Sequence, residues 1–405
     1  MGLIVQKYGG TSVATADRIK SVADRIIRSC ADSHRIVVVV SAMGDTTDDL
    51  IALASQVSSD PDDRELDLLL STGETISCTL MAMALRAKGR DAISLTGGQA
   101  GIRTERAHRR AQITGIEPSR MLRELDLGRV VIVAGFQGIT DDMDVTTLGR
   151  GGSDTTAVAL AVALQADRCE FYKDVDGVLT ADPRIVPRAR KLDEIEYEEM
   201  LELAQHGANV LHHRAVELAS VYGVPLVVRS SFNESPGTYI HGGVGMEIRN
   251  KVRGIAHDID VAKVTLVGVP DRPGIASLLF EPLAENGVSV DVIVQNASLH
   301  GVTDLSFTVS SQDLPRTMRL VEDTAREIGA REVVSSDGWA KVSIVGTGMQ
   351  HTPGYAARMF RSLSDQKINI EMITTSEIRI TCIIRAESVG DAVRGLHDAF
   401  QLETP

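Results

Sequence analysis

Residues 3–12 read LIVQKYGGTS, an apolar run that ends in a lysine, two glycines and two hydroxyl residues. The apolar run predicts a buried β-strand. Apolar residues then recur at the helical spacing i, i+3, i+4, i+7, at Ile19, Val22, Ala23, Ile26 and Ile27. Gly9 and Gly10 let the backbone approach a ligand closely, and the N–H groups that open the following helix suit an anion. Lys7 adds a positive charge at the carboxyl end of the strand, where open α/β sheets place their sites.

The alternation of apolar runs and amphipathic segments continues to about residue 230. Further strands are predicted in RIVVVVSAM (35–43), DAISLTG (91–97), RVVIVAGFQG (129–138), RCEFYKD (168–174) and VPLVVRSS (224–231). Several of these runs are apolar on both faces, as strands covered by helices on both sides should be. The fold class is therefore α/β, an αβα sandwich with a mainly parallel sheet.

Length and composition set the wider limits. A chain of 405 residues predicts two or three domains. A net charge of −13 and 3% aromatic residues argue against nucleic acid and anionic membranes as partners. The four cysteines, Cys30, Cys78, Cys169 and Cys382, have neither metal-ligand nor disulfide spacing. With no signal-peptide pattern at the N-terminus and no apolar run of about 20 residues, we expect a cytoplasmic protein.

An internal repeat follows a Gly-, Pro- and Ser-rich linker at about 232–250. AKVTLVG begins at Ala262 and AKVSIVG at Ala340, and Pro-Gly pairs follow at Pro273 and Pro353. Each copy predicts a βαββαβ unit, so the expected domains are 1–245, 262–335 and 340–405. The pair is either a dimerisation module or a pair of ligand sensors. We favour sensors because Pro-Gly before a helix leaves N–H groups facing a small pocket.

A second glycine turn lies in LGRGGSDTTAVALAVALQA, from Leu148. It holds Gly149, Gly151 and Gly152 with Arg150 between them. The polar residues after it, Ser153, Asp154 and Thr155, are predicted to cap the helix. Two anion-binding turns in one domain predict phosphate handling. The chain has no GxxxxGK[ST] and no GxGxxG after its first strand, so neither a P-loop nor a Rossmann site is predicted.

Other polar residues stand at strand ends or inside apolar helices. Ser41 ends a strand, and Thr47 follows a few residues later. Glu74 stands in an otherwise apolar helical stretch, where an unpaired carboxylate is costly, so it should have a cationic partner, either structural or a ligand ammonium. YKDVDGVLTADPR (172–184) contains ordinary turn signals, but it also places polar side chains after a strand: Lys173, Asp174, Asp182 and Arg184.

Together these motifs resemble the aspartate kinases (aspartokinases). KYGGTS, VVSAMGDTTDDL, STGE, GFQGIT, TTLGRGGSDTTA, DVDGVLTADPR and the two repeats occur in family order from about Val5 to Leu402. The resemblance implies an amino-acid-kinase fold followed by two ACT domains. It also implies an enzyme that uses ATP and Mg²⁺ to phosphorylate the side-chain carboxylate of L-aspartate, which opens the biosynthesis of lysine, threonine and methionine.

The resemblance also implies site residues. Lys7, Arg150 and Asp154 would be catalytic, with Asp154 helping to hold Mg²⁺. Aspartate would bind to Thr11, Ser12, Ser41, Thr47, Glu74, Arg150 and Ser153. ATP would bind to Lys7, Gly9, Gly10, Gly151, Gly152, Lys173, Asp174, Asp182, Arg184 and Asn209. The chain departs from the family pattern at GANVLHHR, where Asn209 replaces a frequent lysine, and we hypothesise that Lys173 supplies the missing charge.

The repeats resemble ACT domains, which implies lysine, threonine or both as inhibitors. Effector residues would be Asp271, Pro273, Gly274, Ile275, Ala276, Asp291, Gln295, Asn296, Asn369, Ile370, Ser376 and Glu377. Strands can be exchanged between such repeats. The expected assembly is a homodimer through the ACT domains, or an α₂β₂ assembly whose shorter subunit starts near Met246; an ordinary linker methionine is the alternative.

Two rival functions remain. One is another amino-acid kinase, such as an acetylglutamate or glutamate kinase, but the paired repeats and SAMGDTTDDL argue against it. The other is a non-catalytic amino-acid-binding regulator with an inactive kinase domain, but intact Lys7, Arg150 and Asp154 argue against that.

Overall fold

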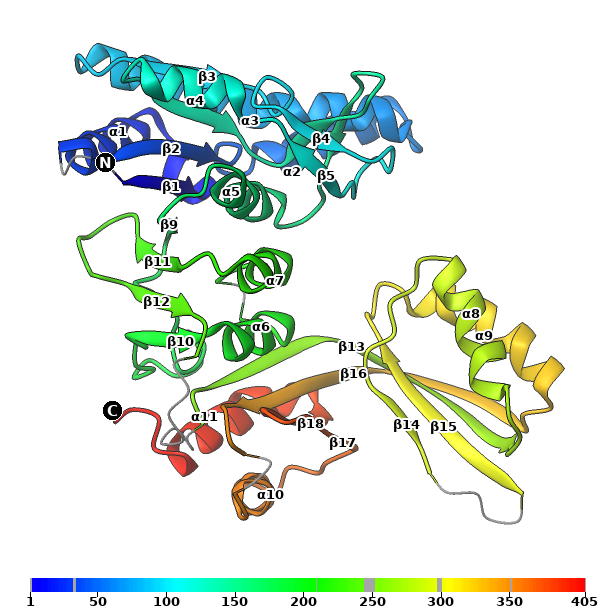
Figure 1. Cartoon of the computed structure of the whole chain (residues 1–405). Coiled ribbons are helices and arrows are strands. Elements are labelled where there is room, and N and C mark those ends of the chain that lie inside the picture. The colour runs from blue at the N-terminus through cyan, green and yellow to red at the C-terminus, as the bar shows by residue number, and fades with distance from the viewer. Residues whose placement is uncertain are drawn as a thin grey trace. The chain divides into compact units, whose positions relative to one another are not determined.

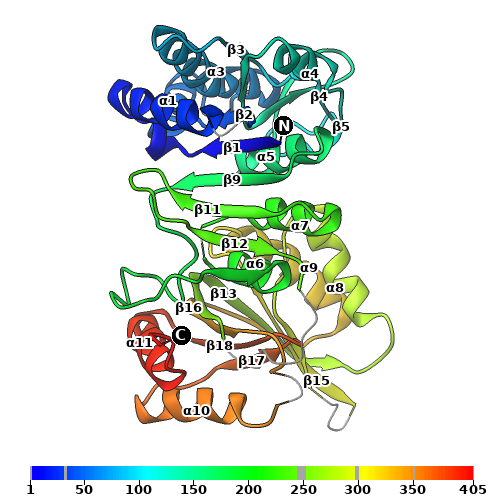
Figure 2. The ribbon, with the colours of Figure 1, turned by 60° about the vertical axis from the view of Figure 1, so that its left-hand side comes forward.

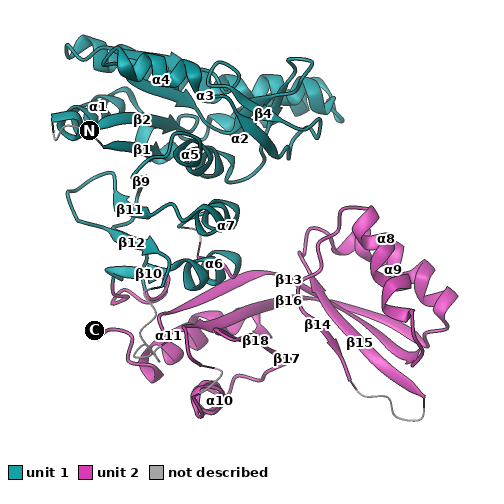
Figure 3. Cartoon of the chain, in the orientation of Figure 1, with its two compact units in different colours: residues 1–179, 191–205, 209–245 teal, residues 180–190, 206–208, 246–405 magenta. Residues whose placement is uncertain are grey.

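The computed structural model describes residues 2–31, 34–208, 210–243, 252–296, 301–349 and 352–404. Asn209 and Met246 lie outside these ranges. The chain forms two compact units: unit 1 holds residues 1–179, 191–205 and 209–245, and unit 2 holds residues 180–190, 206–208 and 246–405 (Figure 3). Because residues 180–190 belong to unit 2, the units are not continuous in the sequence.

Unit 1 is built on an eight-stranded sheet (Figure 1). In spatial order its strands are β10 (Glu194–Glu196), β12 (Thr238–His241), β11 (Leu226–Ser230), β9 (Arg168–Lys173), β1 (Leu3–Tyr8), β2 (Arg35–Val40), β6 (Val130–Ala134) and β3 (Ala92–Leu95). Neighbouring strands are parallel except β11 and β12, which Figure 2 shows side by side. The six predicted strands are all present, and the predicted α/β fold with a mainly parallel sheet is confirmed.

Helices cover both faces of this sheet. They are α1 (Ala16–Ala31), α2 (Thr46–Val57), α3 (Asp63–Ala87), α4 (Ser119–Asp126), α5 (Gly152–Ala163), α6 (Tyr197–Gln205) and α7 (His213–Tyr222). Apolar residues of α1 and α3 form one core with β1, β2 and β6, and they include Ile19, Ile26 and Met81. The alternate strand residues, such as Val37 and Val39, are fully buried on the other face, and α5 packs against β1, β2 and β9.

Helix α3 is long and apolar enough to cross a membrane by length and composition alone. Half of its apolar window is buried inside unit 1, where Cys78, Met81 and Leu85 belong to the core beside the main sheet. In this structure α3 is therefore a core helix.

A second, four-stranded sheet lies in unit 1. Its strands run in the order β5 (Ile113–Ile116), β4 (Ile102–Thr104), β7 (Gln137–Ile139) and β8 (Val145–Thr147). The sequence analysis did not predict this sheet, because its strands are only three or four residues long and lack a sustained apolar alternation. The loop 105–112 joins β4 to β5.

Unit 2 contains one continuous six-stranded sheet. Its strands run in the order β14 (Ile293–Gln295), β15 (Val302–Val309), β13 (Gly254–Pro270), β16 (Glu332–Val345), β18 (Arg379–Arg385) and β17 (Met372–Thr375). Its helices are α8 (Ile275–Glu285), α9 (Leu314–Ile328), α10 (Tyr355–Asp365) and α11 (Val389–Ala399). The predicted pair of ACT-like repeats is confirmed, and both contribute to one sheet.

A strand segment that precedes the first repeat pairs with the second repeat. Residues 254–258 of β13 pair with residues 341–345 of β16, whereas residues 262–270 pair with β15 and with the first half of β16. Ile255 accordingly packs in the core of the second repeat, together with Val342 and Leu396. A segment that precedes the first repeat in the sequence thus completes the sheet of the second.

The pairing of residues 254–258 with the second repeat predicts a stability effect. Ile255→Ala should lower the free energy of unfolding of unit 2 by about 2–5 kcal/mol, because it removes a buried side chain from the second repeat. The nearby exposed change Ile259→Ala is the matched control and should stay within about 0.5 kcal/mol. The fluorescence of Trp339, the only tryptophan in the sequence, reports on this sheet during urea unfolding. Equal effects of the two substitutions would contradict the packing of Ile255 in the core of the second repeat.

Candidate active site

One cleft in unit 1, with a volume of about 500 Å³, brings Lys7 of the first glycine motif together with the second glycine turn, whereas Gly9 and Gly10 are not among its described lining residues. It lies at the carboxyl ends of β1 and β9 and at the start of α5. The predicted site residues that line it are Lys7, Ser41, Thr47, Arg150, Gly151, Gly152, Ser153, Asp154 and Lys173. Lys7 and Arg150 therefore open onto a shared space, as a site for two charged reactants requires.

A buried carboxylate between two lysines lines this cleft. The Nζ of Lys7 lies 2.6 Å from Oδ1 of Asp154, and the Nζ of Lys173 lies 3.0 Å from Oδ2. Burial lowers the pKa of Lys7 to about 8, and the nearby Lys173 ammonium adds to this, while Asp154 opposes it. Burial disfavours the ionised form of Asp154, but Lys173 and Lys7 hold its pKa well below its usual range. The cluster carries more positive than negative charge and suits an anion.

The second glycine turn places Asp154 in this cluster. Gly151 is the N-cap of α5 and has a left-handed φ of 70°. A side chain at Gly151 would also clash sterically, because its Cβ would lie 2.1 Å from the ring of His212. The prediction that Ser153, Asp154 and Thr155 cap the helix is wrong: they lie within its first turn, and the cap has no side-chain hydrogen bond. The Asp154 side chain is thus available to the lysines.

The first glycine turn differs in detail from the prediction. A short 3₁₀ helix, η1 (Gly10–Val13), follows β1, and α1 begins only at Ala16. At Gly10 a Cβ would lie 3.0 Å from the carbonyl oxygen of Ala42, so the turn packs tightly against the chain after β2. A Cβ at Gly9 would lie 3.8 Å from the Nζ of Lys7, which places Gly9 beside the ammonium group.

Two hydroxyl residues of this turn lie elsewhere. Ser12 is buried, and its Oγ lies 2.6 Å from the Oγ of Ser231 and donates to the carbonyl oxygen of Tyr172. Thr11 is exposed. Neither residue is among the described residues that line the cleft, and their role toward aspartate stays a prediction.

Glu74 of α3 is buried with an incomplete set of partners. Its Oε1 accepts a hydrogen bond from the N–H of Ala42 at 3.2 Å, while Oε2 has no hydrogen-bond partner among the described residues. Burial raises the pKa of Glu74 to about 7, although the backbone N–H groups and the charge of Lys7 oppose the rise. No described cation forms an ion pair with Glu74, and whether its partner is a structural cation or a ligand ammonium stays a prediction.

Arg150 is exposed in the cleft and forms no ion pair with the residues that the structure describes. A guanidinium in this state can receive a carboxylate in a bidentate hydrogen-bonded arrangement.

The remaining residues that were predicted to bind the nucleotide are divided between the units. Asp174 is exposed directly after β9 in unit 1. Asp182 and Arg184 belong to the segment 180–190 of unit 2, where Nη2 of Arg184 lies 2.7 Å from Oδ2 of Asp182. Asn209 lies outside the described residues, so its role also stays a prediction.

The predicted effector residues lie at equivalent places of the two repeats. Gly274 and Gly354 are left-handed N-caps of α8 and α10, each after a proline. Asp291 forms an ion pair with Lys341 at 2.6 Å. The other predicted residues lie near the start of α8 or around β14 and β17: Asp271, Pro273, Ile275, Ala276, Gln295, Asn296, Asn369, Ile370, Ser376 and Glu377. Their binding role stays a prediction.

The sequence analysis missed several residues of the cleft. Arg109, Phe136 and Thr147 line it, and they lie in or beside the strands of the small sheet. Arg109 and Phe136 both have left-handed backbones, with φ of 66° and 69°. The sequence held one signal that could have pointed to this part of the cleft. Asp67, like Glu74, is a carboxylate in the apolar pattern of α3.

Comparisons with known proteins identify the class first. The amino acid kinase family model matches residues 2–230, and the ACT domain model matches residues 264–324 and 342–400. The class is an amino-acid kinase followed by paired ACT domains, and the chain is an enzyme of this kind.

Individual related proteins identify the family within this class. The chain is 51% identical to an aspartokinase of Geobacillus stearothermophilus over 99% of the chain and 98% of that protein. It is 49% identical to an aspartokinase of Pseudomonas aeruginosa over 100% and 99%. The crystal structure of E. coli aspartokinase III in complex with aspartate and ADP matches with a TM-score of 0.85 and 26% identity over 98% of this chain and 100% of that one. The chain belongs to the aspartokinase family.

The two-lysine cluster predicts the effect of removing its acid. Asp154→Asn should lower the free energy of unfolding at pH 7 by about 3–5 kcal/mol, because one buried ammonium group, on Lys7, and one partly buried ammonium group, on Lys173, lose their counter-charge. Asp17→Asn, which alters an exposed ion pair with Lys20, is the control and should change it by less than about 0.5 kcal/mol. Chemical denaturation of both variants measures the difference. Equal stabilities would show that Asp154 does not hold the cluster together.

Proposed function

We propose that the protein phosphorylates the side-chain carboxylate of L-aspartate with ATP and Mg²⁺, giving 4-phospho-L-aspartate, the first step toward lysine, threonine and methionine. One observation carries the proposal: a single cleft is lined both by the Lys7–Asp154–Lys173 cluster and by Arg150, which forms no ion pair with the described residues. Relatives at about half identity are named aspartokinases, and E. coli aspartokinase III was crystallised with aspartate and ADP.

The chemistry needs charge neutralisation more than proton transfer. An oxygen of the aspartate β-carboxylate attacks the γ-phosphorus of ATP, the bond from that phosphorus to the β–γ bridging oxygen breaks, and ADP leaves with the electron pair. The carboxylate is ionised already, so no general base is required. Lys7 and Lys173 neutralise charge on the transferring group, and the start of α5 presents backbone N–H groups to it. Alignment in the cleft supplies the remaining acceleration.

Arg150 and Glu74 suit the amino-acid head group. Arg150, which lines the cleft, would bind the α-carboxylate, and Oε2 of Glu74, which is not among the described lining residues, would accept from the α-ammonium. This pairing gives the buried Glu74 carboxylate the cation that the described protein residues do not provide. Ser41, Thr47 and Ser153 add hydroxyl groups around the same space.

Magnesium fits this cleft only as a partner of the nucleotide. Within the described residues there is no group of three or more His, Cys, Asp or Glu side chains that could hold a metal ion. Mg²⁺ is often bound by one or two carboxylates together with substrate phosphates. Asp154 is the residue that would contribute such a carboxylate, and the bound ion would neutralise phosphate charge.

Regulation and assembly extend the proposal. We infer that lysine, threonine or both inhibit the enzyme through the ACT repeats; E. coli aspartokinase III, 26% identical to this chain, was also crystallised with lysine and aspartate in its T-state. The assembly is a homodimer through the ACT domains or an α₂β₂ complex with a subunit that starts near Met246. Mass spectrometry of the natively expressed protein separates these two, and we expect it to be cytoplasmic.

An ATP-dependent hydroxamate assay tests the function. We expect product with L-aspartate, inhibition by lysine, threonine or both, and no product with glutamate or N-acetylglutamate. Product only with the latter substrates would favour the other amino-acid kinases. Binding of amino acids without turnover would favour the non-catalytic regulator.

The two shifted pKa values predict a bell-shaped pH profile. Glu74 must be ionised to pair with an ammonium, so kcat/KM for aspartate should fall as the pH drops below about 7. Lys7 must be protonated, so kcat/KM should fall as the pH rises above about 8. Glu74→Gln should remove the acid limb and lower kcat/KM about 10- to 100-fold, as expected for a lost charged hydrogen bond. An unchanged acid limb in this variant would assign that limb to another group.

Lys173 should compensate for the lysine that is absent at Asn209. Lys173→Thr is expected to raise the KM for ATP about tenfold, because one ammonium no longer contacts the phosphate end of the cleft. The KM for aspartate should change little. Lys20→Thr, on the exposed face of α1, is the control. An unaltered KM for ATP in Lys173→Thr would refute the compensation.

A further inference from the structure

A second arginine, Arg109, lies at the cleft in the loop that joins β4 to β5. It lines the cleft together with Arg150. Its backbone packs against the turn that carries Arg150, because a Cβ at Gly149 would lie 3.0 Å from the carbonyl oxygen of Arg109. The Arg109 backbone therefore lies against the turn that carries Arg150, while the two lysines come from the ends of β1 and β9.

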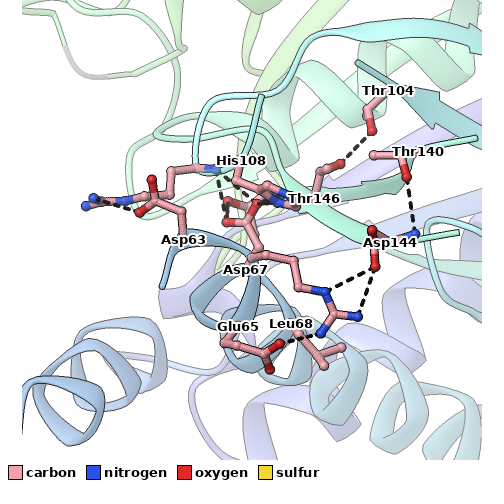
Figure 4. Close-up of polar contacts among 12 residues, drawn as sticks. Asp63, Glu65, Asp67, Leu68, Thr104, His108, Thr140, Asp144 and Thr146 are labelled. Carbon is pink, nitrogen blue, oxygen red and sulfur yellow. Dashed lines mark hydrogen bonds and ion pairs between the residues drawn. The ribbon is translucent and has the colours of Figure 1, made fainter. Parts of the chain in front are cut away.

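Asp67 of α3 holds this part of the loop. Its side chain is fully buried and accepts hydrogen bonds from the N–H of Arg109 at 3.0 and 3.1 Å. It also accepts from the N–H and Oγ1 of Thr147, at 2.9 and 2.6 Å, and lies 3.1 Å from Nδ1 of His108. Figure 4 shows the Asp67 carboxylate directed toward His108 and the strand of Thr146. The Asp67 carboxylate thus connects two residues that line the cleft, Arg109 and Thr147, to α3 through hydrogen bonds.

The backbone of Arg109 is held in a conformation that an arginine rarely adopts. Its φ of 66° is left-handed, and non-glycine residues in this region usually need support from their surroundings. The two hydrogen bonds from its N–H to Asp67 are such support. Because this strain is maintained at the wall of the cleft, it points to a function for the residue.

The guanidinium of Arg109 is only loosely engaged. Its Nη1 lies 3.3 Å from Oδ1 of Asp63, and the two side chains are 62% and 56% exposed. Exposed ion pairs of this kind contribute little and exchange readily. The guanidinium is therefore free to transfer to an anion that binds in the cleft.

We propose that Arg109 is a specificity-determining residue that binds the α-carboxylate of the amino-acid substrate together with Arg150, and that Asp67 is the residue that positions it. The inference rests on the proposed aspartate kinase function. The α-carboxylate is the partner that fits, because the β-carboxylate must stay free to attack phosphorus. In the proposed function the phosphate groups bind to Lys7 and Lys173, which are paired with Asp154.

The test compares L-aspartate with L-aspartic acid α-amide, which lacks the α-carboxylate charge but keeps the reacting β-carboxylate. Arg109→Gly deletes the guanidinium and also relieves the left-handed strain, so the variant should fold. The ratio of kcat/KM for aspartate to kcat/KM for the α-amide should fall about tenfold or more, as expected for the loss of a charge-assisted hydrogen bond. The KM for ATP should stay the same. Arg106→Ala, which alters an exposed arginine of the same loop that pairs with Asp142, is the control and should keep the wild-type ratio.

Asp67→Asn tests the positioning role. It should lower the same ratio, and combining it with Arg109→Gly should lower the ratio no further, because both changes remove one interaction. An additive loss in the double variant would refute positioning. If Asp67→Asn fails to fold, the Arg109→Gly result still decides whether the guanidinium reads the α-carboxylate.

The outcomes separate this inference from the proposed function. If Arg109→Gly keeps the wild-type ratio, or loses activity equally toward both substrates, the specificity role is overturned while the kinase function stands. If the wild-type protein transfers no phosphoryl group from ATP to aspartate, the proposed function itself fails.

Discussion

The Asp154 carboxylate makes the site possible, because it lets two lysines share a buried space. Lys7 and Lys173 reach it from the ends of neighbouring parallel strands, β1 and β9. Without an anion between them the two ammonium groups would repel each other and lose protons at low dielectric. With it, the cluster keeps a positive surplus inside a chain whose formal net charge is −13. Phosphates that enter the cleft meet this local surplus instead of the overall negative field.

The cluster in turn depends on the geometry of one turn. Gly151 must be left-handed and must lack a side chain, because His212 occupies the space that a Cβ would need. This fixes where α5 begins and places Asp154 in its first turn, with its side chain directed to the lysines. A helix capped by a side chain of Ser153 or Asp154 would have used that side chain for the backbone. The absence of such a cap is therefore part of how the site is built.

The parts of the structure that could be predicted are those with a repeated or local signal. The strands, the fold class and the tandem repeats follow from apolar patterns, and Lys7 and Arg150 stand in glycine motifs at strand or helix ends. Arg109 was missed because the strands beside its loop are too short for periodicity, and Asp67 of α3 was missed because its partners lie in and beside those strands. Their contact joins α3 to residues about forty positions later in the chain. The strand segment around Ile255 was missed as part of the second repeat for a similar reason: only register shows which repeat it completes.

The same limit applies to the segment 180–190, which has consequences for regulation. The sequence groups it with the nucleotide site, but its apolar residues Ala181 and Val186 belong to the core of the second ACT repeat. Thr180 fixes the segment there: its carbonyl oxygen accepts from the N–H of Ile255 at 2.8 Å, and its Oγ1 lies 3.0 Å from Nε2 of His397. Coupling between sites requires an element whose arrangement both sites bias. The segment 180–190 follows β9, the strand of Lys173, along the chain, and it packs as part of the ACT core. It is therefore connected to both sites, as such an element must be. An effector that favours one packing of this core would act on a segment that is covalently continuous with the strand that carries Lys173.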